Sequence, residues 1–326
     1  MEMDAALDWA RVLILFCCLA LAARSDYSTL MVKDSHWLRW AVPSAAILFM
    51  ELAIIDTTLL NYCMAGALLA TSSLCMFDPP DLRKTSAWTK EQYSLSIVYG
   101  VGLVGLFGGV ANHSDTDFIA LVLGNESPET TLWWSLLGAI VTTLFFLMAW
   151  RLRIIQGGAD AKALILVTVI FPSWAFLPEP IFPSEGVIFS IPPSMAMFLW
   201  AGAAFLLAPP TLFIQNAARG NISSLSDLKM AWHSTKRPIS EIGKGPSWLL
   251  TDVIEHDGSK KVVNRILPSG GPNSDDEVSR VLEDLGSMGI QSAWVANKHP
   301  FLVYLFVSII PLVLFGDPVG IITSEL

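Results

Sequence analysis

The chain has 326 residues, of which 53% are hydrophobic and only 15% are charged, and its formal net charge is −9. Its apolar runs reach the roughly 20 residues that a helix needs to cross a hydrocarbon core of about 30 Å. This excludes a water-soluble globular protein, no nucleic-acid partner is expected, and the continuous rather than alternating runs favour membrane helices over a β-barrel.

Eight apolar segments are predicted to cross the membrane, so the expected fold is an all-α, polytopic transmembrane helical bundle. They cover residues 6–24, 38–55, 58–77, 94–111, 131–150, 161–178, 188–213 and 300–316. Three parts follow: a transmembrane core at 1–216, a small cytoplasmic insert at 217–299, and a final helix with an outer tail at 300–326. A cleaved signal peptide is not expected, because the residues before the first segment are acidic and no cleavage site follows it.

The first apolar segment delivers the sequence RSDYSTLMVKDSHW to the membrane surface. Asp26 lies just past the segment, and Asp34 lies further along the same stretch, beside Lys33. On position alone, a solvated loop acid is the simplest interpretation of Asp26.

Residues 38–77 are too long for one membrane helix, so a tight hairpin near Asp56 is expected to divide them. Glu51 and Asp56 are then interpreted as shallow acids at the outer surface. The segment 94–111 is rich in glycine, which lets helix backbones approach closely. It is predicted to be a packing helix in the middle of the bundle.

The stretch RLRIIQGGADAKAL carries the most unusual acid of the chain. Asp160 follows Gly157, Gly158 and Ala159, and a long apolar run begins just after Lys162. Charge near hydrocarbon depth is costly, so such an acid is a candidate functional residue. The glycines permit close approach of the backbone, and the start of a helix offers free N–H groups to the carboxylate.

Residues 217–299 are charged and contain no long apolar run, which predicts a small soluble insert. The sequence VIEHDGSKKVVNRIL, at 253–267, is typical of a β-hairpin with an Asp-Gly turn. The sequence SDDEVSRVLEDLGSMGI, at 274–290, predicts a short helix with an acidic first turn.

The basic residues are sorted to one side of the eight-segment bundle. Apart from Arg11, which lies inside the first segment, every Lys and Arg falls in or beside the loops after segments one, three, five and seven. The positive-inside rule makes this side cytoplasmic. A multi-pass protein of the plasma membrane with both termini outside is therefore expected.

Asp26 and Asp160 both lie at cytoplasmic ends of segments, so both are expected at one depth. Two close carboxylates share a proton, which leaves one as base and the other as acid. Such a pair activates water against a peptide carbonyl and protonates the leaving nitrogen. The five histidines are scattered and expected to be solvated, and the four cysteines lie within predicted segments, so no metal, disulfide framework or cofactor is expected.

The sequence GGADAKAL resembles the second-aspartate motif of the type IV prepilin and preflagellin peptidases, membrane aspartyl proteases named for a Gly-x-Gly-Asp (GxGD) signature. In this resemblance Asp160 matches the catalytic acid and Lys162 the lysine that often follows it. Gly157 and Gly158 take the first two positions, and Ala159 takes the third, as expected of the archaeal members.

The sequence SDYSTLMVKDSHW resembles the first-aspartate region of the same family, with Asp26 as its acid. Lys33 and Asp34 stand where a Pro-Asn turn is common, which makes Asp34 the alternative first acid. The resemblance covers roughly residues 1–210. It implies an aspartic endopeptidase that removes the basic leader peptide of pilin-like or archaellin precursors at the cytoplasmic face. The tetracysteine segment of many bacterial members is absent, which argues against a coupled methyltransferase activity.

Two rival hypotheses come from other classes of protein. One is a proton-coupled membrane transporter in which Asp160 is an ion site and broken helices form a pathway. The other is a non-catalytic membrane scaffold of a pilus or secretion complex, in which residues 217–299 bind partner proteins.

Overall fold

The computed structural model describes residues 2–79, 88–183, 190–242, 247–256, 259–266, 275–297 and 300–324. These residues are mostly helical, and their contacts divide them into two compact units. Unit 1 comprises Met1–Arg24, Met31–Gly202 and Phe301–Leu326, and unit 2 comprises Ser25–Leu30 and Ala203–Pro300.

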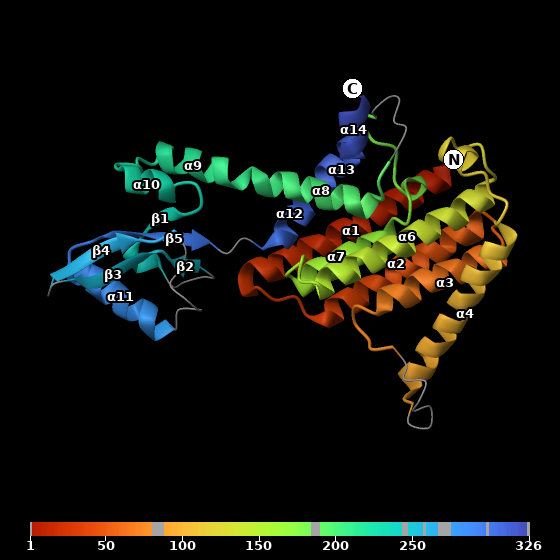
Figure 1. Cartoon of the computed structure of the whole chain (residues 1–326), viewed down its shortest axis with the longest axis horizontal. Coiled ribbons are helices and arrows are strands. Elements are labelled where there is room, and N and C mark those ends of the chain that lie inside the picture. Colours follow the sequence, from red (N-terminus) through yellow and green to blue (C-terminus); the bar gives the residue numbers. More distant parts are fainter. Residues whose placement is uncertain are drawn as a thin grey trace. The chain divides into compact units, whose positions relative to one another are not determined.

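Five helices of the described chain are long and apolar enough to cross a membrane (Figure 1). They are Ala5–Thr29 in α1 (Glu2–Thr29), α2 (Asp34–Ile54), Gln92–Asn112 in α4 (Lys90–Asn112), α6 (Pro128–Arg151), and the run formed by α8 (Pro193–Leu206) with α9 (Ala208–Ala218). The two helices are interrupted at Leu207, and Pro209 and Pro210 lie in the first turn of α9.

The other three predicted segments form shorter helices, so the count of eight spans is not confirmed. The helix α3 (Leu59–Ser73) has 15 residues and α7 (Gly158–Ile170) has 13. The last segment is divided into α12 (Phe301–Val307) and α13 (Ile309–Phe315). The helix α7 ends early because Phe171 precedes a proline, which disfavours helical geometry; Phe171 has φ −125° and ψ 77°.

The helix α7 is the central helix of unit 1. Every residue from Ala163 to Ile170 is buried. The helix packs against α2, α3, α6 and α12, and Figure 1 shows it running beside α6 and α2. A helix that is apolar on all sides must be enclosed by others. Core packing therefore fixes the helix whose first turn carries Asp160.

The glycine-rich helix α4 packs against α3 at the edge of unit 1. A Cβ atom at Gly105 would lie 2.5 Å from the backbone of Cys63, so only glycine allows this approach. Another face of α4 exposes large apolar side chains, including Val104 and Phe107. The predicted packing role of the glycines agrees with this geometry, whereas the predicted location in the middle of the bundle is wrong.

Unit 2 contains a three-stranded antiparallel sheet in the order β1 (Thr235–Pro238), β5 (Ser292–Asn297), β2 (Ser247–Leu249). Leu249 lies opposite Val295 in the register. A hairpin of β3 (Thr251–His256) and β4 (Ser259–Asn264) and the helix α11 (Asp275–Ser287) belong to the same unit. The remaining short elements are α5 (Phe118–Val122) and α14 (Pro318–Ser324) in unit 1, α10 (Leu225–Met230) in unit 2, and 3-10 turns at Trp174–Phe176 and Ile239–Glu241.

The structure confirms the predicted hairpin and short helix of the insert, while the Asp-Gly turn at 257–258 lies outside the described residues. The three-stranded sheet is not predicted from the sequence, so the all-α class is wrong for this part of the chain. Its strands have three to six residues, and β1 pairs with β5, which is distant in sequence. Such strands leave no local periodicity to detect. The helix α9, which the sequence places in the membrane core, groups with unit 2.

Candidate functional site

Asp160 lies in the first turn of α7, three residues after the N-cap residue Gly157. A Cβ atom at Gly157 would lie 2.1 Å from Oδ2 of Asp160. The carboxylate is therefore folded back over the N-cap, and a Cβ atom at residue 157 would displace it. The N–H groups at the start of α7 carry partial positive charge, which favours an anionic carboxylate there.

The other two small residues of the motif let the turn pack closely against its surroundings. A Cβ atom at Gly158 would lie 3.2 Å from Cζ2 of Trp150, a residue of the last turn of α6. Ala159 packs against the hydrophobic core of unit 1. The turn that carries Asp160 is thereby held between the core and the end of α6.

Lys162 forms an ion pair with Asp34, with 2.5 Å between Nζ and Oδ1. The Lys162 side chain is 11% exposed and that of Asp34 is 65% exposed. The Lys162 ammonium also lies 5.7 Å from the centroid of the Trp150 ring. The structure therefore brings the alternative first acid, Asp34, to the second-aspartate motif.

Asp26 lies inside α1, which continues to Thr29 and ends before Leu30, a residue in the left-handed region with φ 55°. Its relative exposure is 9%, so the interpretation as a solvated loop acid is wrong. Asp26 belongs to the segment that groups with unit 2, whereas Asp160 belongs to unit 1. The pairing of these two acids stays a prediction.

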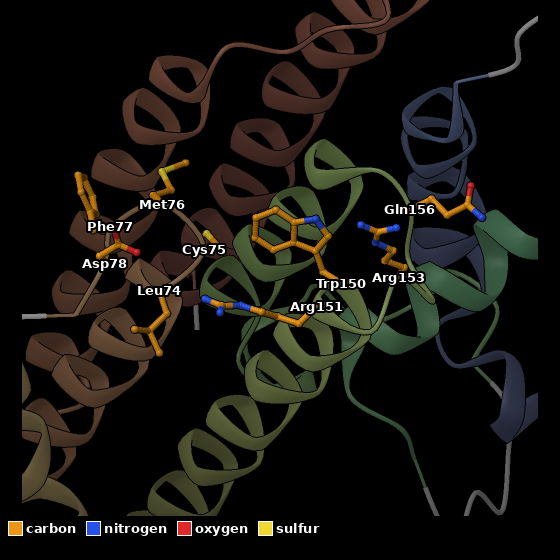
Figure 2. A pocket seen from close by; sticks show the side chains of 9 residues that line it. All are labelled: Leu74, Cys75, Met76, Phe77, Asp78, Trp150, Arg151, Arg153 and Gln156. Atoms are coloured by element: carbon orange, nitrogen blue, oxygen red, sulfur yellow. The ribbon is translucent and has the colours of Figure 1, made fainter. Parts of the chain in front are cut away.

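A cavity of about 700 Å³ opens in unit 1 beside this turn (Figure 2). One wall is the segment Leu74–Asp78 after α3, and the other runs from the last turn of α6 to the residue before α7. The lining residues are Leu74, Cys75, Met76, Phe77, Asp78, Trp150, Arg151, Arg153 and Gln156. Trp150 contacts both Gly158 and Lys162, so one side chain joins the cavity to the motif. Beside it, a smaller apolar cavity of about 130 Å³ is lined by Lys162 and residues of α2, α3 and α7.

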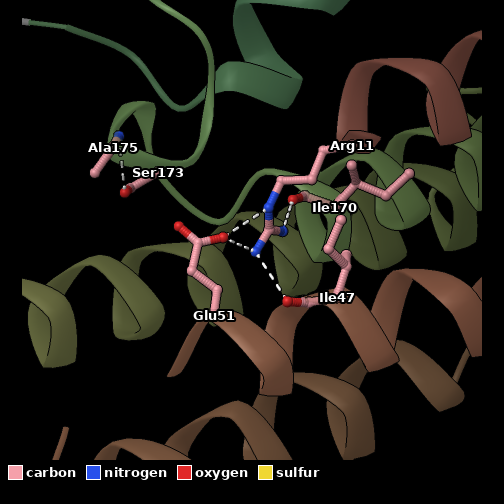
Figure 3. Close-up of polar contacts among 6 residues, drawn as sticks. All are labelled: Arg11, Ile47, Glu51, Ile170, Ser173 and Ala175. Carbon is pink, nitrogen blue, oxygen red and sulfur yellow. Dashed lines mark hydrogen bonds and ion pairs between the residues drawn. The ribbon is translucent and has the colours of Figure 1, made fainter. Parts of the chain in front are cut away.

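A buried ion pair in unit 1 was not predicted from the sequence. Arg11 is fully buried and donates to Glu51, to the carbonyl oxygen of Ile47, and to that of Ile170 at 2.5 Å (Figure 3). The guanidinium carbon also lies 4.8 Å from the centroid of the Phe176 ring. Glu51 is only 6% exposed, so it is not a solvated surface acid, while its predicted position near the outer end stays a prediction. The available signal was that each charge interrupts an apolar run, in two adjacent segments.

The sequence predicts that all the histidines are solvated. Two histidines of the described chain instead contact other residues. Nε2 of His36 lies 3.2 Å from the carbonyl oxygen of Cys18, and Nδ1 of His113 lies 3.2 Å from Oγ1 of Thr130. The side chains of His256 and His299 lie outside those that are described. Among the described residues, no group of three or more His, Cys, Asp or Glu is placed to hold a metal ion, and the four cysteines are free thiols.

No protein-family model, curated protein or solved structure matches this chain. Its function is therefore inferred from its motifs and from the geometry around Asp160.

Proposed function

We propose that this chain is a membrane aspartic endopeptidase that removes the basic leader of pilin-like or archaellin precursors at the cytoplasmic face. The observation that carries this proposal is the Asp160 turn. A carboxylate is held over a glycine N-cap at the start of a buried helix, and the same helix lines the small apolar cavity with Lys162, Ile165 and Leu166. The GxGD-like motif that suggested the family supplies this arrangement.

The proposed protein is multi-pass, with both termini outside the plasma membrane. Five helices are long and apolar enough to cross a bilayer, and the proposed orientation uses the eight segments predicted from the sequence, an even number that returns the chain to the side where it began. Arg151, Arg153 and Lys162 gather around the Asp160 turn, and clusters of basic residues mark the cytoplasmic end of membrane helices. The acid then lies where the leader of a membrane-anchored precursor leaves the bilayer.

Asp160 acts together with Asp26 in the proposed reaction. The ionised carboxylate removes a proton from water, and the hydroxide oxygen forms a bond to the peptide carbonyl carbon. The protonated carboxyl gives its proton to the carbonyl oxygen. The C–N bond then breaks as the nitrogen takes the proton that the first carboxylate removed from water, and a hydroxyl proton of the intermediate returns to the second carboxylate. A new carboxyl terminus and a new amine are released. Neither a covalent intermediate nor a metal is required for this balance.

The substrate class follows from the predicted position of Asp26 and Asp160 at the cytoplasmic face. The precursor helix stays in the membrane while its basic leader stays in the cytoplasm, so the bond between them reaches the depth of Asp160. The small apolar cavity lined by Ile165, Leu166 and Val169 offers room for an apolar side chain beside that bond.

The test is cleavage of a co-expressed precursor in membranes, with each variant compared at equal accumulation. Asp160→Asn and Asp26→Asn are expected to abolish cleavage, because the amide can neither accept the water proton nor donate as an acid. Asp34→Asn is expected to retain cleavage. Asp115→Asn, an exposed acid far along the chain, is the matched control.

Retained cleavage by Asp160→Asn would overturn the proposal. Loss in Asp34→Asn together with retention in Asp26→Asn would keep the peptidase but exchange the first acid, which the Asp34–Lys162 ion pair makes a concrete alternative.

The buried Arg11–Glu51 pair favours a transporter as the second candidate, because ionisable residues inside a helical bundle commonly mark ion or proton pathways. Proton-coupled flux into proteoliposomes that disappears in Glu51→Gln and Asp160→Asn, without any precursor cleavage, would support the transporter. Cleavage without flux would support the peptidase.

A further inference from the structure

The larger cavity of unit 1 carries an excess of positive charge. Arg151 and Arg153 line it together with one acid, Asp78. Neither arginine forms an ion pair or a side-chain hydrogen bond with any residue that the structure describes. Figure 2 shows the Arg151 side chain extending from the end of α6 toward Leu74–Asp78. The planar guanidinium suits bidentate binding of phosphate oxygens, so the cavity fits a phosphate-bearing anion.

The cavity also lies where a candidate membrane helix ends. The apolar span Pro128–Arg151 finishes at the first of the two arginines. The turn that follows alternates arginine with exposed apolar side chains, Leu152 at 63% and Ile154 at 74% exposure. Arg153 has φ 60°, a backbone conformation uncommon for residues with a side chain. Alternating arginine and apolar side chains beside a tryptophan are typical of a segment at the level of lipid headgroups.

We propose that this cavity binds the phosphodiester headgroup of an anionic glycerophospholipid. Arg151, which extends toward Leu74–Asp78, pairs with the phosphate oxygens, and Asp78 accepts a hydrogen bond from a headgroup hydroxyl. Arg153 and Gln156, on the other side of Trp150 in Figure 2, donate to the remaining headgroup oxygens. The apolar side chains of Leu74–Phe77 contact the glycerol backbone and the first methylene groups. A volume of about 700 Å³ lies within the usual range of small-molecule sites, which is about 300–1,000 Å³.

Charge separates this site from the proposed peptide site. The leader of the proposed substrate is basic, and the two unpaired arginines repel it, whereas they attract a lipid phosphate. The inference depends on insertion into a membrane and does not depend on peptidase activity. A bound lipid would connect the segment after α3 with the turn before α7. Gln156 in this turn directly precedes Gly157 of the Asp160 motif.

The test measures which lipid the purified full-length protein retains in neutral detergent. Native mass spectrometry counts bound phosphatidylglycerol and phosphatidylcholine, each added at the same mole fraction. Wild type is expected to retain phosphatidylglycerol with about a ten-fold preference, because both lipids carry the phosphate but the quaternary ammonium of phosphatidylcholine is repelled by the arginines and offers Asp78 no hydroxyl, and one hydrogen bond to a charged group contributes about that factor. The double variant R151Q/R153Q is expected to lose most of this preference.

The matched control is R24Q/R39Q, which removes the same charge from the same predicted face without changing the cavity lining. It is expected to keep the preference. R151K/R153K keeps the charge but loses the planar donors, so its preference for phosphatidylglycerol should fall below that of wild type. This variant also tests the proposal if R151Q/R153Q does not accumulate.

Equal retention of the two lipids by wild type would overturn the proposal, as would equal losses in the control and cavity variants. A third arm adds inorganic phosphate in place of the lipid. Complete displacement of phosphatidylglycerol by millimolar phosphate would overturn the lipid as the ligand and assign the cavity to a soluble phosphate. Loss of precursor cleavage with an intact lipid preference would affect only the proposed peptidase.

Discussion

Arg11 of α1 and Glu51 of α2 form an ion pair inside the apolar core of unit 1, with Nε of Arg11 3.0 Å from Oε2 of Glu51. Their side chains are 0% and 8% exposed. The same guanidinium donates to the carbonyl oxygen of Ile170, the last residue of α7. One cation therefore joins three helices and satisfies the end of α7 opposite to Asp160.

Replacing either member of this pair alone is expected to destabilise the protein. Arg11→Met or Glu51→Leu leaves an uncompensated buried charge, at a cost of about 3–5 kcal/mol, whereas R11M/E51L removes both charges and should cost less than the two changes summed. Unfolding of the purified variants in mixed micelles measures this. Leu13→Ala, at a 62% exposed position of α1, is the control and should change little. Additive losses in the double variant would contradict the pairing.

Gly157→Ala is expected to reduce cleavage of the precursor without preventing folding. The new methyl group would lie 2.1 Å from Oδ2 of Asp160, so the carboxylate must move. Displacing a catalytic group by about 1 Å costs roughly 100-fold in rate. The backbone at Gly157, with φ −84° and ψ 116°, accepts alanine, so the protein should accumulate normally.

The control for this change is Gly138→Ala in α6, where an added Cβ atom would have no neighbour within 4 Å. It should cleave at the wild-type rate. Equal cleavage by the two alanine variants would show that the position of the Asp160 carboxylate over residue 157 has no role in the reaction.

Five of the eight predicted segments form helices long and apolar enough to cross a membrane, because apolar runs mark such helices directly. The ends of the helices were not predictable in this way. The apolar run at 161–178 continues past Pro172, so counting apolar residues extends the segment although α7 ends at Ile170. Similarly, α1 continues past its apolar run to Thr29, which places Asp26 inside a helix. Helix ends depend on capping and on tertiary packing that a hydropathy pattern does not contain.

In the candidate site, too, one part was predictable from the sequence and another was not. The turn at Gly157 to Asp160 was predictable because its residues are adjacent and their spacing states the geometry. The Lys162–Asp34 pair joins residues 128 positions apart, and the Arg11–Glu51 pair joins residues 40 positions apart. Each of these four charged residues could be explained by its sequence neighbours alone, so no local pattern predicted a distant partner. Such pairs become evident only when the packing of the helices is known.

Unit 2 is expected to lose stability at acid pH through Asp227. Burial raises the pKa of this carboxyl, but hydrogen bonds from Ser223, Ser224 and Trp294 outweigh it, and the pKa lies below its ordinary value of 3.8. A carboxyl with a lowered pKa stabilises the folded state above its unfolded pKa, and this contribution is lost as the pH falls through the folded value. The contribution should therefore be constant from pH 7 to 5 and decline below about pH 4.

Thermal unfolding of the full chain between pH 7 and 3 measures this decline. Asp227→Asn is expected to lower stability at pH 7 and to flatten the acid dependence, because the amide does not titrate. Glu241→Gln, an exposed carboxyl of the same unit, should leave the profile unchanged. An Asp227→Asn profile parallel to wild type would exclude this carboxyl as the titrating group.

Gly105→Ala is expected to weaken the packing of α4 on α3, whereas Gly100→Ala in the same helix should not. The new Cβ atom at Gly105 would lie 2.5 Å from the backbone of Cys63 and Met64, and backbone atoms cannot move aside as a flexible side chain does. Overpacking of this kind costs about 1–3 kcal/mol. At Gly100 an added Cβ atom meets nothing within 4 Å, and alanine is the better helix former by about 1 kcal/mol, so stability should stay equal or rise. Unfolding in the same mixed micelles separates the two variants. Equal stability of both would mean that the glycines do not set the distance between these helices.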